Sequence, residues 1–154
     1  MTWMLRPFRN DDIEPVVRLW EQAGLTRPWN DPRADIRRKL EVQPELFLVA
    51  ETEAGPDAEA KVATGDGGIV GSVMAGYDGH RGWLYYLAVA ESHRRQGVAR
   101  ALVTEAERLL LGMGCPKVQL MVRGGNEKVL GFYDALGYER FDVSNTGKRL
   151  IADA

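Results

Sequence analysis

Residues 83–113, WLYYLAVAESHRRQGVARALVTEAERLLLGM, decide the fold of this chain. The run 83–89 is rich in aromatic and aliphatic side chains, which is typical of a buried strand. After the basic segment 94–97, apolar residues recur at the spacing of an amphipathic helix: Val98, Leu102, Ala106, Leu109, Leu110 and Met113. The stretch therefore predicts a strand, a basic turn that contains a glycine, and a long helix that begins at the turn.

The basic turn lies at a predicted helix N-terminus, a place that stabilises anions. The first N–H groups of a helix lack intrahelical acceptors, and the helix dipole places about half a positive charge there. Arg94 and Arg95 add full charges, and Gly97 allows a ligand to approach the backbone closely. These features favour a pyrophosphate as ligand. Alternatively, the two arginines are solvated surface charges and Gly97 is an ordinary turn residue.

Two motifs in the expected order resemble one enzyme family. A dinucleotide fingerprint or a P-loop would need glycines and a lysine that the turn does not have. Arg94, Gly97 and Ala99 instead match the arginine-x-x-glycine-x-small signature of the GNAT-type N-acetyltransferases, which this chain resembles. Asn126 and Tyr133 match that family's asparagine and tyrosine, seven residues apart and followed by Leu-Gly-aromatic. Seven residues are about two helical turns, so both side chains lie on nearly one helix face.

The resemblance covers nearly the whole chain, and three stretches point to one subgroup of the family. Residues 25–32, 76–82 and 147–151 resemble the bacterial YpeA-type acetyltransferases. The resemblance implies acetyl-CoA as co-substrate, with the turn amides on its pyrophosphate. The central strand, splayed after residue 87, would present backbone groups to the pantetheine arm.

Tyr133 and Asn126 would complete the predicted site. Asn126 would contact the pantetheine arm, and Tyr133 would be the catalytic residue that protonates the departing coenzyme A sulfur. Alternatively, Asn126 only caps a helix and Tyr133 only fills the core. The cofactor-binding residues implied by the resemblance are Leu87, Ala88, Val89, Arg94, Arg95, Gln96, Gly97, Val98, Ala99, Asn126 and Tyr133.

The acceptor-amine site is expected beside the loop that joins the first two helices, where the family places it. In this chain that loop holds Trp29, Asn30 and Asp31, and we add His80 from the turn before the central strand as a substrate-binding residue. Alternatively, Asp31 only caps a helix whose first residue is Pro32, and Trp29 only packs.

A general base is missing where some relatives carry one. Their strand before the asparagine has a glutamate, and Met121 stands at that position here. The alternatives that would act through a water, each with an ordinary surface role as well, are Asp31, Asp78, Glu91 and His80. At pH 7 an α-amine with a pKa of about 7.7–8.0 is uncharged in roughly one molecule in ten, and a lysine amine in about one in 2,500. We therefore expect a peptide N-terminus or small-molecule amine as acceptor, rather than a lysine side chain.

Length and composition limit the class of protein. A chain of 154 residues fits one domain, so we expect a single N-acetyltransferase domain over residues 1–154. Twenty basic and 22 acidic residues nearly balance, which disfavours a nucleic-acid partner. No apolar run approaches the roughly 20 residues of a membrane span, and no signal peptide is evident. Cys115, the single cysteine, has no partner at metal-ligand spacing and favours a reducing compartment. We expect a cytoplasmic protein without a metal or a membrane partner.

The remaining segments predict an α/β fold. Residues 52–68, rich in Ala, Gly, Asp, Glu and Thr, predict a flexible loop. Strands other than the central one are predicted at 4–8, 46–51, 69–77, 117–122, 138–143 and 148–151. With the resemblance, this predicts a mixed, mostly antiparallel central sheet of about six or seven strands with helices on both faces, the GNAT-like acyl-CoA N-acyltransferase fold. The cofactor cleft would lie where two central strands part.

Two functions are weighed. The first is an acetyltransferase that moves an acetyl group from acetyl-CoA to an amine by direct attack. The alternative is a non-catalytic acyl-CoA-binding protein that regulates a partner. Tyr133 discriminates between them, because a binder needs no proton donor beside the sulfur. A homodimer is compatible with either function.

Overall fold

The computed structural model describes residues 3–52 and 68–153. The predicted loop 52–68 therefore lies, apart from its two end residues, outside the described residues. The helices and strands are β1 (Trp3–Pro7), η1 (Asn10–Asp12), α1 (Ile13–Gln22), α2 (Pro32–Glu41), η2 (Pro44–Leu46), β2 (Phe47–Thr52), β3 (Ile69–Tyr77), β4 (Gly82–Val89), η3 (Glu91–His93), α4 (Val98–Gly112), β5 (Val118–Gln119) and α5 (Glu127–Ala135). Within these residues, no helix has the length and apolarity that crossing a membrane would require.

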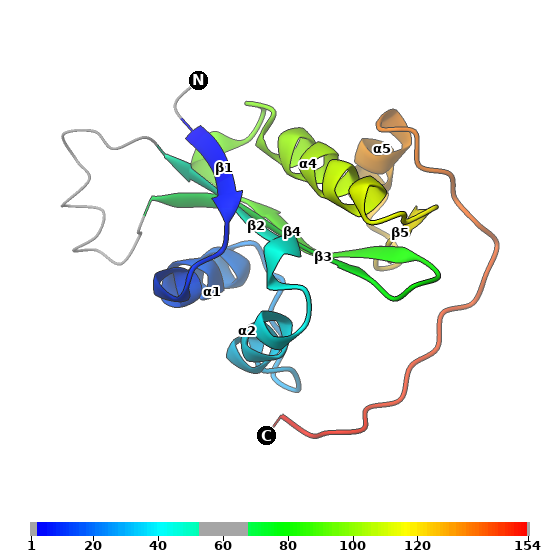
Figure 1. Cartoon of the computed structure of the whole chain (residues 1–154), viewed down its shortest axis with the longest axis horizontal. Coiled ribbons are helices and arrows are strands. Elements are labelled where there is room, and N and C mark those ends of the chain that lie inside the picture. The colour runs from blue at the N-terminus through cyan, green and yellow to red at the C-terminus, as the bar shows by residue number, and fades with distance from the viewer. Residues whose placement is uncertain (1–2, 53–67, 154) are drawn as a thin grey trace.

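The sheet is mixed and mostly antiparallel, as predicted. Its strands lie in the order β1-β2-β3-β4-β5, and only the β4–β5 pair is parallel. Helices α1 and α2 cover one face and α4 and α5 the other (Figure 1). The described residues form five strands, so the six or seven strands that we predicted are not confirmed.

Each face of the sheet has its own apolar core. On the α4 face, Leu102 and Leu110 pack on the sheet together with Tyr133 of α5. On the α1 face, Trp20 and Phe47 are the largest buried side chains. The two cores follow from the alternation of side chains along each strand, which points successive residues to opposite faces.

The start of α4 lies against the end of β4. Val89 pairs with Gly71 of β3, and Val98 contacts the same glycine so closely that a Cβ there would lie 2.8 Å from Val98 Cγ1. Gly71 thus lets the helix approach the sheet backbone. The turn between β4 and α4 is held at both ends by buried contacts.

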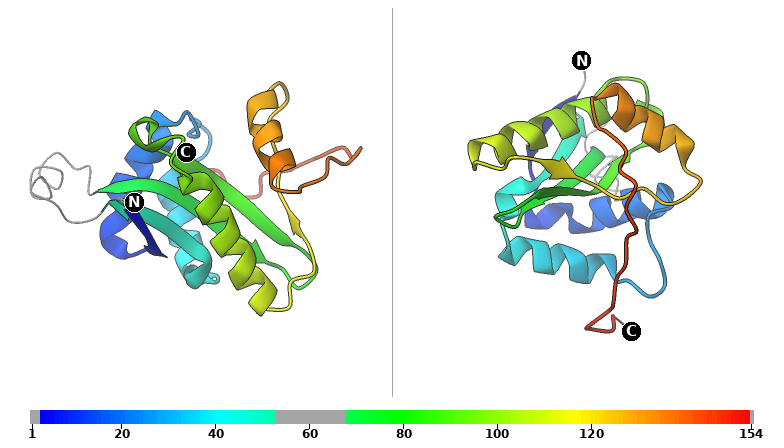
Figure 2. Two further views of the ribbon diagram at one scale, coloured as in Figure 1. Left: turned by 90° about the horizontal axis from the view of Figure 1, so that it is seen from above. Right: turned by 90° about the vertical axis from the view of Figure 1, so that its right-hand side faces the viewer.

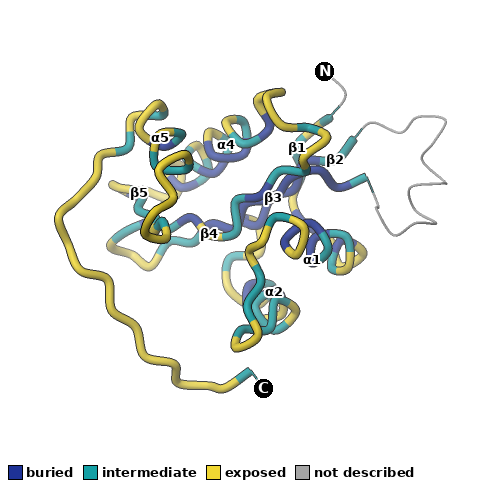
Figure 3. The backbone as a smooth tube through the Cα atoms, turned by 180° about the vertical axis from the view of Figure 1, so that it is seen from behind, coloured by how far each residue is buried: buried dark blue, intermediate teal, exposed yellow. Residues whose placement is uncertain are grey.

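The C-terminal segment differs from the prediction. Residues 138–143 and 148–151 form no strand; the segment runs extended from α5 past the β5 side of the sheet to α2 (Figure 2). It is almost wholly exposed up to its last residues, with Val143 79% and Leu150 87% exposed (Figure 3). The strand prediction for these two segments was wrong, because a strand also needs a partner for its hydrogen bonds and the described sheet pairs neither segment. Strand β5 is likewise shorter than the predicted 117–122.

Candidate active site

A bulge interrupts β4 in the middle of the sheet. Ser72 pairs with Ala88 and Met74 with Tyr85, so two residues of β4, Tyr86 and Leu87, face a single residue of β3. Tyr86 has a left-handed backbone with φ 52°, which is uncommon for a residue with a large side chain. Bulges of this kind re-aim side chains and end regular pairing.

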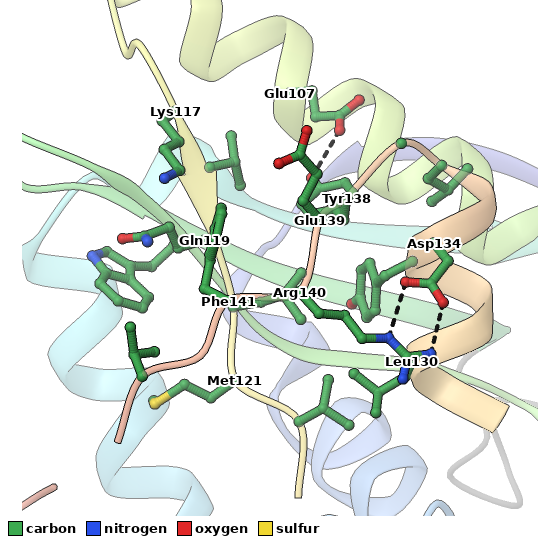
Figure 4. A pocket seen from close by; sticks show the side chains of 18 of the residues that line it. Glu107, Lys117, Gln119, Met121, Leu130, Asp134, Tyr138, Glu139, Arg140 and Phe141 are labelled. Carbon is green, nitrogen blue, oxygen red and sulfur yellow. Dashed lines mark hydrogen bonds and ion pairs between the residues drawn. The ribbon is translucent and has the colours of Figure 1, made fainter. Parts of the chain in front are cut away.

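Strands β4 and β5 part soon after they meet. Their pairing joins Gly82 to Val118 and Trp83 to Gln119, and no further pair follows within the described residues. The opening predicted after residue 87 is present, and it begins earlier, at Trp83. A groove of about 1090 Å³ lies beside β5 and α5, lined among others by Trp83, Met121 and Tyr133 (Figure 4).

The basic turn has the features that an anion needs. Gly97 is the N-cap of α4 with φ 80°, and no side chain caps the helix. Arg95 also has a left-handed φ of 64°, so Arg95 and Gly97 both have left-handed backbones, with Gln96 between them. A turn of this kind points successive N–H groups to one side. In the part of the chain that the structure describes, neither Arg94 nor Arg95 has a carboxylate partner, and Arg94 through Gly97 are exposed. A Cβ on Gly97 would meet no atom within 4 Å, so the space above the turn is open.

Strand residues Leu87, Ala88 and Val89 precede this turn, from which Ala90 and η3 separate them. Ala88 is buried on the α1 face, and Leu87 and Val89 pack on the α4 core. Their backbone pairs with β3 on one side, while the edge toward β5 is open beyond Trp83. The open edge of β4 and the basic turn lie close together along the chain, which suits a long ligand with an anionic end.

Helix α5 carries Asn126 and Tyr133. Asn126 is the N-cap, and its side chain accepts a hydrogen bond from the Val129 N–H at 3.4 Å. Tyr133 is 6% exposed, and its ring packs edge-on against Phe132 and Tyr138. Burial raises the pKa of Tyr133 to about 12, so its hydroxyl keeps its proton at neutral pH. Both residues also have the structural roles that we weighed as alternatives.

The predicted acceptor residues divide into two groups. Asp31 caps α2, accepting from the Arg33 N–H at 2.9 Å, and Trp29 is 62% exposed. Asn30 is hydrogen-bonded to Tyr86 of β4. His80 lies apart from them: it occupies the exposed β3–β4 turn, where its N–H bonds to Asp78, and among the described residues none of its hydrogen bonds reaches the loop.

A polar cluster joins this loop to the bulge, and sequence reasoning missed two of its members. Tyr86 Oη donates to Asp35 Oδ2 at 2.7 Å, and Asn30 Nδ2 donates to the same oxygen at 2.6 Å and to Tyr86 Oη at 3.1 Å. Burial, followed by the neighbouring Asp35 carboxylate, raises the pKa of Tyr86. Asp35 and Tyr86 are 51 positions apart, and no motif in the sequence marks either of them.

Arg149 and Asp153, near the C-terminus, hydrogen-bond to residues of this cluster and to its neighbours Arg38 and Asp31. Arg38 Nη1 donates to Asp35 Oδ1 at 3.1 Å and Arg38 Nη2 to Asp153 Oδ1 at 2.7 Å. Asp153 also accepts from the Asp31 N–H at 2.9 Å, and Arg149 donates to Asn30 Oδ1. The Arg38 guanidinium and then the Asp31 N–H lower the pKa of Asp153 to about 2.

Comparison with known proteins gives one consistent result. A family model described as the acetyltransferase (GNAT) family matches residues 15–138. A Pectobacterium atrosepticum protein named as an acetyltransferase is 51% identical over 149 residues, which are 97% of this chain and 96% of that protein.

Solved structures agree with the fold. Ard1 from Thermoplasma volcanium superposes with a TM-score of 0.72 at 28% identity, covering 89% of this chain and 82% of that chain. The NatC complex bound to Gag peptide and CoA gives a TM-score of 0.75 at 22% identity over 92% of this chain and 87% of that one. These likenesses support the mixed α/β arrangement described above.

Proposed function

This chain belongs to the acetyltransferase (GNAT) family and is an acetyltransferase, and we propose that it transfers the acetyl group of acetyl-CoA to an amine by direct attack. The observation that carries the proposal is the uncapped N-terminus of α4 beside the opening between β4 and β5. Three features come together here: the basic turn at the start of α4, the open edge of β4, and the buried, protonated Tyr133. A thioester donor that carries a pyrophosphate fits these three features.

The residues of the turn and of β4 would hold the donor. Backbone amides from Arg95 to Ala99 would bind the pyrophosphate, with Arg94 and Arg95 supplying charge. The open edge at Leu87 to Val89 would bind the pantetheine arm, and one of its N–H groups would stabilise the negative charge that develops on the acetyl oxygen. Acetyl-CoA supplies an activated acyl group, so the chain has to position and polarise it and to move protons.

Tyr133 would supply the proton for the leaving thiolate. Its hydroxyl is neutral at pH 7, since burial raises its pKa to about 12, and it lines the groove beside the opening. General acid catalysis of this kind contributes about 10²- to 10⁴-fold. Asn126, at the start of the same helix, would contact the pantetheine arm.

The acceptor would be an amine with a low pKa. The strand position where some relatives have a glutamate holds Met121, which is exposed, so no carboxylate stands there to deprotonate a lysine ammonium. An α-amine with a pKa of about 7.7–8.0 reaches the site uncharged far more often than a lysine amine. A peptide N-terminus or a small-molecule amine is therefore the favoured substrate.

The experiment measures acetyl transfer from acetyl-CoA to a panel of amines: peptides with free N-termini, small amines, and a lysine peptide whose N-terminus is blocked. We expect turnover with the first two classes, and acetyl-CoA should also raise the melting temperature of the protein. High turnover with the blocked lysine peptide alone would overturn the proposed acceptor class. Protection by acetyl-CoA without transfer to any amine would favour the non-catalytic binder.

A further inference from the structure

Tyr86 is partly buried, and its ring and backbone are both held by buried side chains. Its ring stacks on Trp20 with centroids 3.7 Å apart. Trp20 Nε1 donates to Ser72 Oγ at 2.8 Å, and Ser72 Oγ donates to the Tyr86 carbonyl oxygen at 2.9 Å. Trp20 and Ser72 are fully buried, so both the ring and the left-handed backbone of Tyr86 are fixed. A strained backbone held this way is a feature of functional sites.

The hydrogen bonds of the Tyr86 hydroxyl have a definite direction. Because Arg149 donates to Asn30 Oδ1, the Asn30 amide must turn its Nδ2 toward Asp35 and Tyr86. Tyr86 Oη accepts from that Nδ2 and gives its own proton to Asp35 Oδ2. A phenolic oxygen keeps a further acceptor position, so the hydroxyl can accept one more proton donor while passing its own proton to Asp35.

Tyr86 and Tyr133 lie on opposite faces of the sheet. Tyr86 packs with the core on the α1 face, and Tyr133 belongs to the core on the α4 face. Strands β4 and β5 are not paired beyond Trp83 and Gln119 within the described residues. Tyr86 lies on β4 beyond the last β4–β5 pair, and Tyr133 lines the groove beside β5. Acyl transfer to an amine needs one proton donor and one proton acceptor.

We propose that Tyr86 and Asp35 form the proton-accepting relay for the acceptor amine, on the face opposite Tyr133. The inference rests on the proposed function. As the amine nitrogen bonds to the acetyl carbon and the carbon–sulfur bond breaks, the nitrogen gives a proton to Tyr86 Oη, and the Tyr86 proton moves to Asp35 Oδ2. Tyr133 protonates the departing sulfur, and exchange with solvent restores both residues.

Arg38 and Asp153 position Asp35. Arg38 binds the second oxygen of Asp35, and Asp153 holds Arg38 in place. This leaves Asp35 Oδ2 to Tyr86 and Asn30, and the Asp35 side chain is 24% exposed, which allows exchange with solvent. The competing explanation is that the cluster only ties α2 and the C-terminal residues to the sheet.

The test compares Tyr86→Phe, Asp35→Asn and the double variant, with acetyl-CoA and a peptide N-terminus as substrates. We expect each single variant to lose about 10²- to 10⁴-fold in kcat. The double variant should lose no more than the worse single variant, because both residues act in one relay. Asp35→Glu should recover part of the rate. Tyr77→Phe, which removes an exposed hydroxyl from the neighbouring strand, is the matched control and should keep wild-type kcat.

The melting temperature of each variant, and the increase in it that acetyl-CoA causes, distinguish loss of the relay from loss of folding or of cofactor binding. Folded single variants with normal acetyl-CoA protection, low kcat and a non-additive double variant support the relay. Wild-type kcat in either single variant, losses that multiply in the double variant, or loss of acetyl-CoA protection along with activity would overturn it. A wild-type protein that binds acetyl-CoA but acetylates no amine would instead reject the proposed function on which the relay depends.

Discussion

Tyr133 shows how one residue can serve both packing and chemistry. Its ring contacts Phe132 and Tyr138, so part of its burial is explained by the core of α5. The same burial keeps its hydroxyl protonated, because the charged phenolate is disfavoured in an apolar environment. A substitution that removes the hydroxyl and keeps the ring can therefore separate the two roles.

For Tyr133→Phe we expect kcat to fall about 10²- to 10⁴-fold if the hydroxyl is the main general acid, with little change in the affinity for acetyl-CoA. The physical reason is that the hydroxyl acts on charge that develops only in the transition state. Steady-state kinetics and a titration with acetyl-CoA measure the two effects. Tyr138→Phe is the control, since that hydroxyl is bound to Glu107 at 2.8 Å. Full activity in folded Tyr133→Phe would remove Tyr133 from the mechanism.

For Gly97→Val we expect acetyl-CoA to lose most of its stabilising effect. A β-branched side chain would fill the open space above the turn and disfavour the left-handed φ of 80°. The strain alone should cost about 1–2 kcal/mol of folding free energy. Gly79→Val is the matched control, because Gly79 has φ 90°, is equally open, and lies in the β3–β4 turn. Thermal unfolding with and without acetyl-CoA should show normal protection for Gly79→Val, and equal protection in both variants would count against the turn as cofactor site.

At the scale of elements, short-range patterns were sufficient for α4 and insufficient for the C-terminal segment. The apolar spacing after residue 97 predicts α4 to within one residue of its end, because a helix satisfies its hydrogen bonds within itself. Segment 138–151 has a strand-like pattern, yet its partner depends on the rest of the fold. The Tyr86–Asp35 contact was unpredictable for the same reason, since it needs the β4 bulge and the packing of α2 together.

The C-terminal segment is fixed at its end by Asp153, and that anchor should depend on pH. The Asp153 side chain is 1% exposed, and its ion pair with Arg38 contributes to a pKa of about 2, against about 3.9 in an unfolded chain. A carboxyl whose pKa falls on folding stabilises the protein above its unfolded pKa, and this contribution is lost as pH falls through the folded pKa.

Asp153→Asn should therefore be less stable than wild type at neutral pH, and the difference should shrink as pH falls from about 4 toward about 2. Urea unfolding over this pH range measures it. Asp142→Asn is the control, because Asp142 is exposed and forms no ion pair among the described residues. A stability difference that stays constant across the range would show that the charge of Asp153 does not anchor the segment.

At the scale of the whole molecule, the sheet divides the proposed chemistry between two faces. Strand β4 is paired with β3 on both sides of the bulge at Tyr86 and Leu87, whereas toward β5 it is open beyond Trp83. The α4 face would bring the donor pyrophosphate site and the acid, Tyr133; the α1 face would bring the acceptor loop and the relay. The donor would thus be bound from the α4 face and the acceptor from the α1 face, and the two would meet where β4 and β5 part.

This arrangement predicts where acetyl-CoA should slow hydrogen exchange. The amides of β4 beyond Trp83 that face away from β3 have no strand partner within the described residues, and the first amides of α4 have no intrahelical acceptor, so both groups should exchange rapidly in the free protein. A bound donor that hydrogen-bonds to them should protect peptides covering residues 84–89 and 95–99. Peptides from β1, at the far edge of the sheet, should change little. Gly97→Val should lose the protection at 95–99. Protection spread evenly over β1 and β4 would mean general stabilisation without a ligand along the open edge.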